Sequence, residues 1–82
     1  MVTVFFDESF EKTVRKVKDN FVKEKIKKQI EKIMQNPEIG KPMRYSRINT
    51  REVYISPYRL SYLFLKNEDR LIILELYHKD EQ

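Results

Sequence analysis

The period of hydrophobic and polar positions changes several times along this chain, and each change predicts a new element. β-Branched and aromatic residues dominate 2–6, which predicts a short strand. Apolar residues at spacings of three and four between 10 and 35 predict helix. Alternation between apolar and polar residues in 51–55, 58–65 and 71–78 predicts three further strands. The pattern therefore predicts an α+β domain with the order β-α-α-β-β-β.

The helical region carries two apolar stripes that differ in phase, and the shift falls at Asp19-Asn20. A single helix from Ser9 to Gln35 would be about 40 Å long, whereas a domain of this size is about 30 Å across. We therefore expect a helical hairpin, with Asn20 as the cap of its second helix, packed on one face of a small twisted antiparallel sheet. The first stripe comprises Phe10, Val14, Val17 and Phe21, and the second comprises Val22, Ile26, Ile30, Ile33 and Met34.

The predicted strand at 58–65 contains Arg59 among apolar and aromatic residues. Burying a guanidinium is costly without an anionic partner, and alternation puts Arg59 on the face opposite its aromatic neighbours. We therefore expect Arg59 on the open face of the sheet. Two registers of the last hairpin remain: a five-residue turn sets Arg59 opposite Tyr77, and a four-residue turn sets it opposite His78.

Composition limits the class of protein. A chain of 82 residues forms one small domain, here taken as 1–82. It has no cysteine and one histidine, so we expect no disulfide and no metal site. No stretch approaches the roughly 20 apolar residues of a membrane span, and the first residues lack the basic region of a signal peptide. We expect a cytoplasmic protein with no small-molecule cofactor.

The net charge of +4 is concentrated in one segment, 41–59, where Glu52 is the single acidic residue. Most of its cations are arginines, whose rigid fork suits phosphate. This segment indicates an anionic partner, most simply a nucleic acid, and a solvated basic loop is the alternative interpretation. The five cations are Lys41, Arg44, Arg47, Arg51 and Arg59.

The element order, together with GKPM after the second helix, YRLSY within a strand and LIILELYHKD near the end, resembles the RelE/ParE superfamily of type II toxin–antitoxin toxins. The resemblance implies a twisted sheet with the helical hairpin on one face. In the RelE, YoeB and HigB branches of this superfamily the toxins are ribosome-dependent endoribonucleases that cut mRNA at the A site. In the ParE branch they poison DNA gyrase.

The resemblance also implies roles for single residues. Arg59 matches the arginine that contacts the scissile phosphate in the nuclease branches, and His78 matches a histidine of YoeB-like toxins, so both are expected to be catalytic. Lys79 stands where those toxins carry a tyrosine. Glu52 is the acid nearest to the region of their general base. The residues expected to bind RNA are Lys41, Arg44, Arg47, Arg51, Tyr77 and Lys79.

The favoured interpretation is a metal-independent, ribosome-dependent mRNA endoribonuclease that inhibits translation. Two alternatives are a ParE-type toxin that binds gyrase and a small nucleic-acid-binding domain without toxicity. The expected partners are mRNA, the ribosomal A site and a cognate antitoxin. Exposed apolar patches mark interaction sites, and the antitoxin is expected to cover one near the open face, formed in at least one register by Leu63, Leu65, Leu71 and Ile73.

Overall fold

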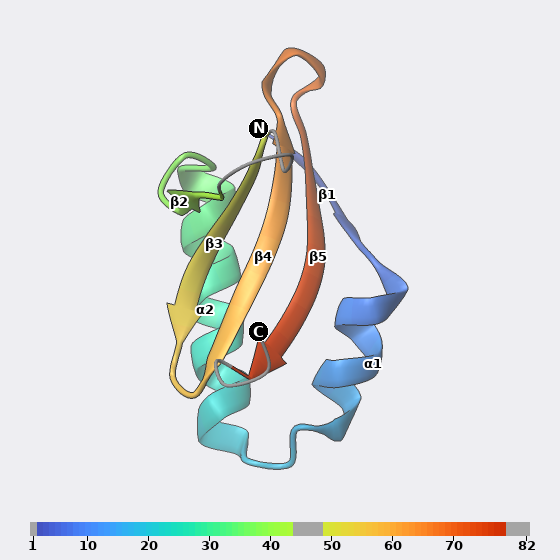
Figure 1. Ribbon diagram of the computed structural model, residues 1–82, viewed down its shortest axis with the longest axis vertical. Helices are drawn as coiled ribbons and strands as arrows, with labels where there is room; N and C mark the ends of the chain where they lie inside the picture. The colour runs from blue at the N-terminus through green and yellow to red at the C-terminus, as the bar shows by residue number, and fades with distance from the viewer. Residues whose placement is uncertain (1, 44–48, 79–82) are drawn as a thin grey trace.

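The computed structural model of the protein describes residues 2–43 and 49–78 and has an α+β fold (Figure 1). The predicted order of a strand, two helices and three strands is confirmed, with one additional strand of two residues between the second helix and the strand predicted at 51–55. Within these ranges no helix is long and apolar enough to cross a membrane. The elements are β1 (Thr3–Phe6), α1 (Glu8–Lys16), α2 (Asn20–Gln35), β2 (Lys41–Pro42), β3 (Thr50–Ile55), β4 (Tyr58–Leu65), the 3-10 turn η1 (Lys66–Glu68) and β5 (Arg70–His78).

The strands form a single sheet in the order β1-β5-β4-β3-β2. The neighbours from β2 to β5 are antiparallel as expected, whereas β1 pairs in parallel with β5, so the whole sheet is mixed. Parallel pairing requires a long connection between the two strands, and the helices with the three middle strands supply it. Residues far apart in the chain thereby become neighbours, with Thr3 opposite Arg70.

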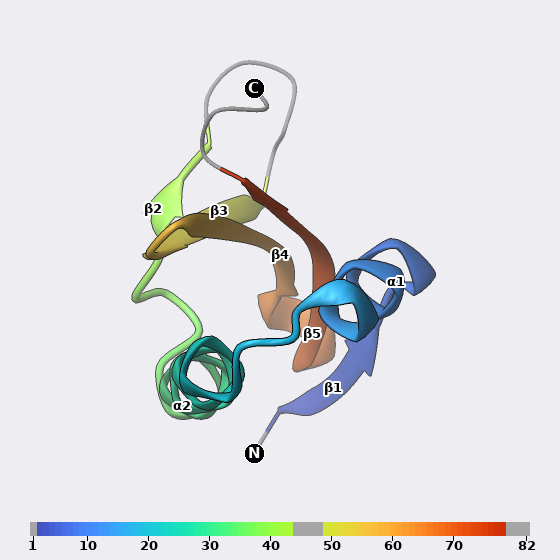
Figure 2. The same cartoon turned by 90° about the horizontal axis from the view of Figure 1, so that it is seen from below.

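Both helices lie over the same face of the sheet (Figure 2). α1 packs against β5, and α2 packs against β3. The predicted break between them is confirmed at 17–19, but the N-cap of α2 is Asp19 rather than Asn20. The Asp19 carboxylate accepts a hydrogen bond of 2.9 Å from the backbone N–H of Phe21, which leaves Asn20 as the first residue of the helix. Asp7 caps α1 in the same way.

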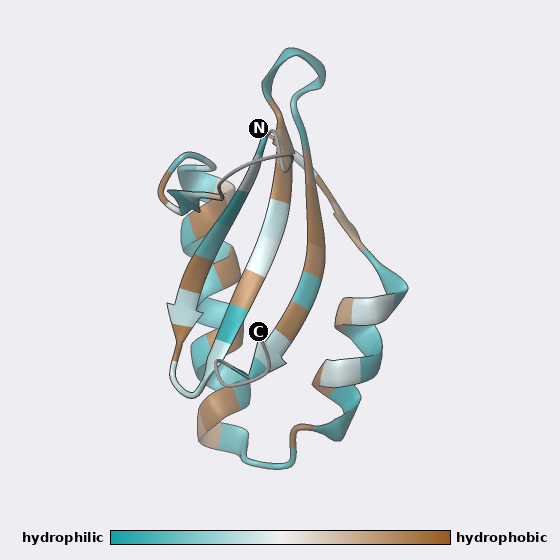
Figure 3. Ribbon diagram, viewed as in Figure 1, coloured by the Kyte–Doolittle hydropathy of each residue, from teal (hydrophilic) through white to brown (hydrophobic). Residues whose placement is uncertain are grey.

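The core lies between the two helices and the face of the sheet that they cover. Hydrophobic bands recur along both helices (Figure 3), but two residues of the predicted stripes are exposed, Phe21 by 71% and Met34 by 39%. Phe21 belongs to the first turn of α2, so the break at Asp19 removes it from the stripe of α1. Met34 follows Ile33, which takes the inward position. The buried apolar residues are Phe10, Val17, Val22, Ile26, Ile33, Ile55, Leu60, Tyr62, Leu71, Ile73 and Leu76.

The hairpin of β4 and β5 changes register along its length. Leu65 pairs with Arg70 at the turn, and a β-bulge between Ser61 and Tyr62 shifts the pairing by one residue. Beyond this bulge Arg59 lies opposite Tyr77, as in one of the two predicted registers. A bulge of this kind re-aims side chains next to it.

The bulge also decides which apolar residues reach the open face. The prediction that Leu71 and Ile73 contribute to an exposed apolar patch is wrong, because both are fully buried in the core. Ile72 lies between them and points to the opposite face. It is half-buried there and pairs with Leu63, which is also half-buried. The apolar part of the open face therefore includes Leu63 and Ile72.

A buried tyrosine fixes the segment that leads from α2 into the sheet. The Tyr62 hydroxyl accepts a hydrogen bond of 2.9 Å from the Gly40 N–H and donates one of 2.7 Å to the Pro37 carbonyl. Burial raises the pKa of Tyr62 above its usual range. A Cβ atom at Gly40 would lie 2.5 Å from the hydroxyl oxygen, so this close approach requires glycine. The next residue, Lys41, is thereby held opposite Glu52 at the edge of the sheet.

Candidate active site

Three neighbouring strands bring a glutamate, an arginine and a tyrosine together on the open face of the sheet. The short turn between β3 and β4 sets their register, so that Glu52 lies opposite Ser61, two positions along β4 from Arg59. On the other side of β4, Tyr77 of β5 lies opposite Arg59. Because side chains alternate between the faces of a strand, these three groups point away from the helices that cover the core.

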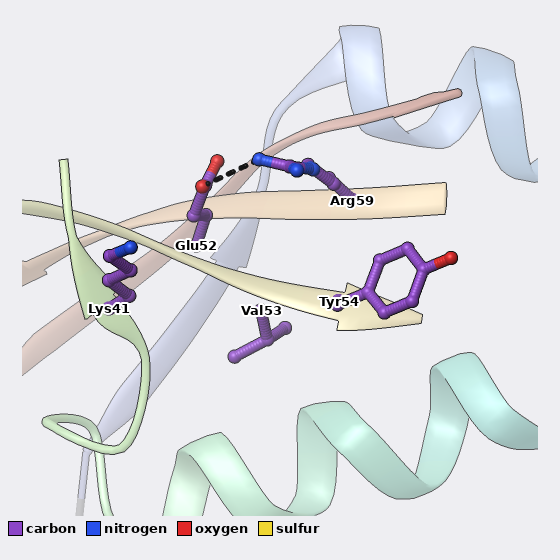
Figure 4. Close-up of a pocket in the computed structure, with 5 residues that line it drawn as sticks. All are labelled: Lys41, Glu52, Val53, Tyr54 and Arg59. Carbon is purple, nitrogen blue, oxygen red and sulfur yellow. Dashed lines mark hydrogen bonds and ion pairs between the residues drawn. The ribbon is translucent and has the colours of Figure 1, made fainter. Parts of the chain in front are cut away.

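The carboxylate of Glu52 links the side chains of Arg59 and Tyr77. One of its oxygens accepts a hydrogen bond of 3.1 Å from Arg59 Nη1, and the other accepts one of 2.8 Å from the Tyr77 hydroxyl. Figure 4 shows the Arg59–Glu52 contact above the strands. The side chains of Arg59 and Glu52 are 36% and 20% exposed, so the pair is partly shielded yet reachable from solvent. Two charge-assisted bonds therefore hold the carboxylate in one orientation.

An open pocket lies beside this ion pair (Figure 4). Its lining brings Lys41 and Arg59 to either side of the single carboxylate of Glu52, and Tyr54, which is 55% exposed, adds an aromatic ring. Positive charge attracts phosphate, and an exposed aromatic ring can stack on a base. The pocket thus combines features suited to a nucleotide with a carboxylate that can accept a proton. The lining residues are Lys41, Glu52, Val53, Tyr54 and Arg59.

Two buried polar atoms on β4 have no hydrogen-bond partner within the described ranges, namely Arg59 Nε and Ser61 Oγ. The Ser61 side chain is fully buried although its residue type is polar. A buried donor without a partner costs about 1–3 kcal/mol of stability, and such groups in native proteins call for an explanation. Both atoms belong to the same face of the same strand.

Arg51, predicted to bind RNA, does not reach this pocket. It precedes Glu52 in β3 and points to the helical side of the sheet, where its Nη1 donates to the Glu38 and Gly40 carbonyls at 3.0 and 2.8 Å. Its Nη2 also lies 3.8 Å from the Glu38 carboxylate. These hydrogen bonds satisfy backbone carbonyls that follow the end of α2, so Arg51 has a structural role in this segment.

His78, predicted to be catalytic, lies at the end of β5 opposite Tyr58. Its ring meets the Tyr58 ring edge-on, with 5.8 Å between the centroids. Alternation along β5 puts His78 on the side of the buried Leu76, and Tyr77 on the side of Arg59. The structure thus brings Tyr77, but not His78, into contact with the Glu52–Arg59 pair. Three further predicted residues, Arg44, Arg47 and Lys79, lie outside the described residues.

The predicted set of site residues omits Glu52, which the structure makes the centre of the cluster. A signal for it was present in the sequence. A two-residue turn at Ser56-Pro57 pairs the strands on either side of it directly, and counting back from this turn brings Glu52 beside Arg59. In the part of the chain that the structure describes, no group of three acidic or histidine side chains could hold a metal ion.

Comparisons with known proteins agree on a toxin fold. A family model described as the ParE toxin of the type II toxin–antitoxin system parDE matches residues 4–82. A chain of the intact E. coli RelBE toxin–antitoxin complex is 21% identical with a TM-score of 0.82, and the match covers 95% of this chain and 96% of that one. The comparison with curated proteins gives no match.

Two further solved structures share the fold at similar identity. A chain of the RelBE2 toxin–antitoxin complex from Mycobacterium tuberculosis is 22% identical with a TM-score of 0.79, over 95% of this chain and 98% of that one. A YoeB/ParE toxin from Agrobacterium tumefaciens is 17% identical with a TM-score of 0.82, over 94% of this chain and 98% of that one. The three structures carry the same arrangement of helices and sheet.

Proposed function

The chain belongs to the ParE toxin family of type II toxin–antitoxin systems, and on this premise we propose that it is a cytoplasmic mRNA endoribonuclease that acts on translating ribosomes. The observation that carries the proposal is the Glu52 carboxylate held between Arg59 and Tyr77 on the open face of the sheet. A proton acceptor beside a phosphate-binding cation is the pair of groups that metal-independent RNA cleavage needs.

The proposed reaction is an internal transfer of the phosphate ester. The RNA 2′-hydroxyl gives its proton to Glu52 and attacks the adjacent phosphorus, and the bond from phosphorus to the 5′-oxygen breaks. The products are a 2′,3′-cyclic phosphate and a 5′-hydroxyl. Arg59 neutralises the charge that develops on the phosphoryl oxygens, and Tyr77 holds the carboxylate in one orientation before the substrate arrives.

The leaving 5′-oxygen must take up a proton. We assign this role to His78, since an imidazole can donate a proton to a leaving group. The residue follows Tyr77 at the end of β5 but faces the other side of the sheet. The role therefore requires that the RNA pass across the end of the sheet. This assignment is separate from that of Glu52 and Arg59, and it has its own test in the Discussion.

RNA binding is assigned to the cations around the pocket. Lys41 lines it directly, and Arg44, Arg47 and Lys79 are expected to extend the contact. Tyr54 offers its exposed ring to a base. If these cations follow RNA phosphates, ribosome binding weakens steeply with salt, because each neutralised phosphate releases a counterion.

A cognate antitoxin is the second proposed partner. The RelBE and RelBE2 structures that share this fold are toxin–antitoxin complexes. On this chain the open face offers the half-buried Leu63 and Ile72 near the basic pocket. A short acidic protein that covers this apolar surface and neutralises the cations would suppress toxicity. It is expected to copurify with the toxin when both are produced together.

The experiment that tests the nuclease function is inducible expression followed by primer-extension mapping of mRNA 5′ ends. The expected result is growth arrest with new 5′ ends inside translated reading frames, and no new ends in untranslated RNA. The Glu52→Gln variant should strongly reduce both effects. Arrest without new 5′ ends would contradict the proposal.

Gyrase inhibition is the second candidate function, because the family model that matches the chain is that of ParE. It predicts a different response to the same expression experiment: DNA-damage signalling with intact mRNA. It also predicts an association with its protein target that depends little on salt. Absence of any growth arrest would leave a non-toxic nucleic-acid-binding domain.

A further inference from the structure

We propose that Ser61 and the Nε edge of Arg59 form a phosphate-binding subsite that the Glu52–Tyr77 hydrogen bond covers in the free protein. The inference builds on the proposed function, which supplies an RNA phosphate as the ligand. It assigns a role to Ser61 that neither its residue type nor its position in a strand suggests.

The first step concerns the two unpaired atoms. Ser61 Oγ and Arg59 Nε are both buried donors without a hydrogen-bond partner among the described residues. They lie two positions apart on β4, so their side chains share one face of the sheet. Two adjacent donors that lack an acceptor fit an oxyanion, which offers several acceptor oxygens at once.

The second step concerns the geometry of the guanidinium. Arg59 Nη1 is engaged by Glu52 at 3.1 Å. In a planar guanidinium the Nε–H and one Nη2–H are parallel and can bind two oxygens of one phosphate. Arg59 can therefore keep its Glu52 contact on one edge while the other edge receives a phosphate. The Ser61 hydroxyl would donate to the same group from the strand below.

The third step identifies what covers the two donors. Glu52 lies on β3 directly opposite Ser61, and Tyr77 lies on β5 directly opposite Arg59. Their hydrogen bond of 2.8 Å therefore crosses β4 above these two residues. A phosphate that reaches this position meets the negative charge of Glu52 and opens its hydrogen bond to Tyr77, while Arg59 Nη1 keeps its contact with the carboxylate. The subsite thus opens when the ligand arrives.

The test measures phosphate binding apart from catalysis. Arg59 Nε–H is observed directly in ¹H–¹⁵N NMR spectra, and its signal is followed while inorganic phosphate, or a short RNA whose 2′-hydroxyls are replaced by 2′-O-methyl groups, is added at constant ionic strength. Both probes are expected to move the signal downfield. Ser61→Ala should weaken the binding of both about tenfold, the effect of one lost hydrogen bond to a charged group. Glu52→Gln should strengthen it about tenfold, since a like charge is removed.

Ser9→Ala serves as the matched control, because Ser9 is exposed on α1 and its replacement should leave phosphate binding unchanged. The thermal midpoint of Ser61→Ala should not fall below that of the parent, because the variant loses a buried donor that has no partner. Three results would each overturn the subsite. They are an unchanged phosphate affinity in Ser61→Ala, a thermal midpoint of this variant several degrees below that of the parent, and an Arg59 Nε–H signal that does not move when phosphate is added. Binding of inorganic phosphate without binding of the RNA would also overturn it.

The outcomes separate this inference from the proposed function. If the parent binds phosphate through Ser61 but cuts no mRNA, the subsite stands and the nuclease function fails. If the parent cuts mRNA and Ser61→Ala cuts it at the same rate with the same phosphate affinity, the nuclease function stands and the subsite fails.

Discussion

The hydroxyl of Tyr77 on β5 lies 2.8 Å from the carboxylate of Glu52 on β3, so the two side chains meet across the intervening strand β4. This bridge holds the carboxylate above the sheet while Arg59 balances its charge from β4. In the proposed reaction, these two partners hold the carboxylate ready to accept a proton from a substrate that enters the adjacent pocket.

Replacing Glu52 tests this role most directly. Glu52→Gln keeps the size of the side chain and removes the proton acceptor, so mRNA cleavage should slow about a hundredfold or more. Single-turnover cleavage of mRNA on purified ribosomes measures the effect. Glu75→Gln is the matched control, because Glu75 flanks Ser61 from the opposite strand and is exposed. Equal losses of cleavage rate in Glu52→Gln and Glu75→Gln would mean that cleavage depends on negative charge in general and not on the Glu52 carboxylate.

Arg59 should be needed for cleavage but not for folding. It lies on the open face with 36% of its side chain exposed, so Arg59→Ala should unfold at a temperature close to that of the parent. Loss of one charge-assisted donor to the reacting phosphate should slow cleavage about a hundredfold. Arg59→Lys should recover only part of the rate, because it keeps the charge and loses the fork. An unfolded Arg59→Ala, or one that still arrests growth, would assign Arg59 a structural role.

His78 should contribute less than Glu52. Its ring lies against Tyr58, on the side of the sheet opposite the Glu52–Arg59 pair. We expect His78→Ala to slow cleavage about tenfold, and to change the shape of the pH–rate profile because the proposed proton donor to the leaving oxygen is lost. Rates measured between pH 5.5 and 8.5 for parent and variant check this. An unchanged pH profile would remove His78 from the proton transfer.

Gly40 should be intolerant of any side chain. A Cβ atom there would lie 2.5 Å from the Tyr62 hydroxyl oxygen and 2.8 Å from a ring carbon. Gly40→Ala must therefore shift the ring or the segment, and we expect a loss of about 1–3 kcal/mol in the free energy of unfolding. The same substitution in a Tyr62→Phe background should cost less, because the nearest clashing atom is gone. Denaturant unfolding of the four proteins gives this coupling, and strict additivity would contradict the clash.

Tyr62 should make the fold sensitive to alkaline pH. Its burial raises its pKa in the folded protein above the usual value of about 10. As pH rises, Tyr62 therefore loses its proton in the unfolded chain before it does so in the folded protein. The contribution of Tyr62 to stability is complete below about pH 10 and is lost as pH rises through its higher pKa in the folded protein. Tyr62→Phe should be less stable near neutrality and lose less stability above about pH 10. Tyr54→Phe is the control, since Tyr54 is 55% exposed.

The sequence predicts the elements of this fold well because its apolar periods are long and distinct. Arg59 could be assigned to the open face from alternation alone, and its partner Tyr77 was one of two alternatives. The sequence does not reveal the β-bulge that shifts the pairing between Leu65–Arg70 at the turn and Arg59–Tyr77, because a single extra residue leaves the apolar pattern nearly unchanged. This is why Leu71 and Ile73 were assigned to the wrong face.

The candidate site shows the same limit. Arg51 and Arg59 count equally as positive charges in the sequence. In the structure Arg51 faces the helices and contacts backbone carbonyls, whereas Arg59 faces the pocket. Glu52 has its role because of pairing between strands, a relationship that charge and composition do not contain. Counting residues from the turn at Ser56-Pro57 does predict this pairing, because the turn fixes which residues of the two strands lie opposite each other.

The parallel pairing of β1 with β5 has a consequence for how the toxin is made. A growing chain presents β1 and both helices long before β5 leaves the ribosome. Until then β1 has no neighbouring strand, α1 has no sheet to cover, and Glu52 lacks the hydroxyl of Tyr77. The pocket therefore assembles only when synthesis of this fold is nearly complete. Under the proposed nuclease function, late assembly of the pocket would spare the ribosome and the message that produce the toxin.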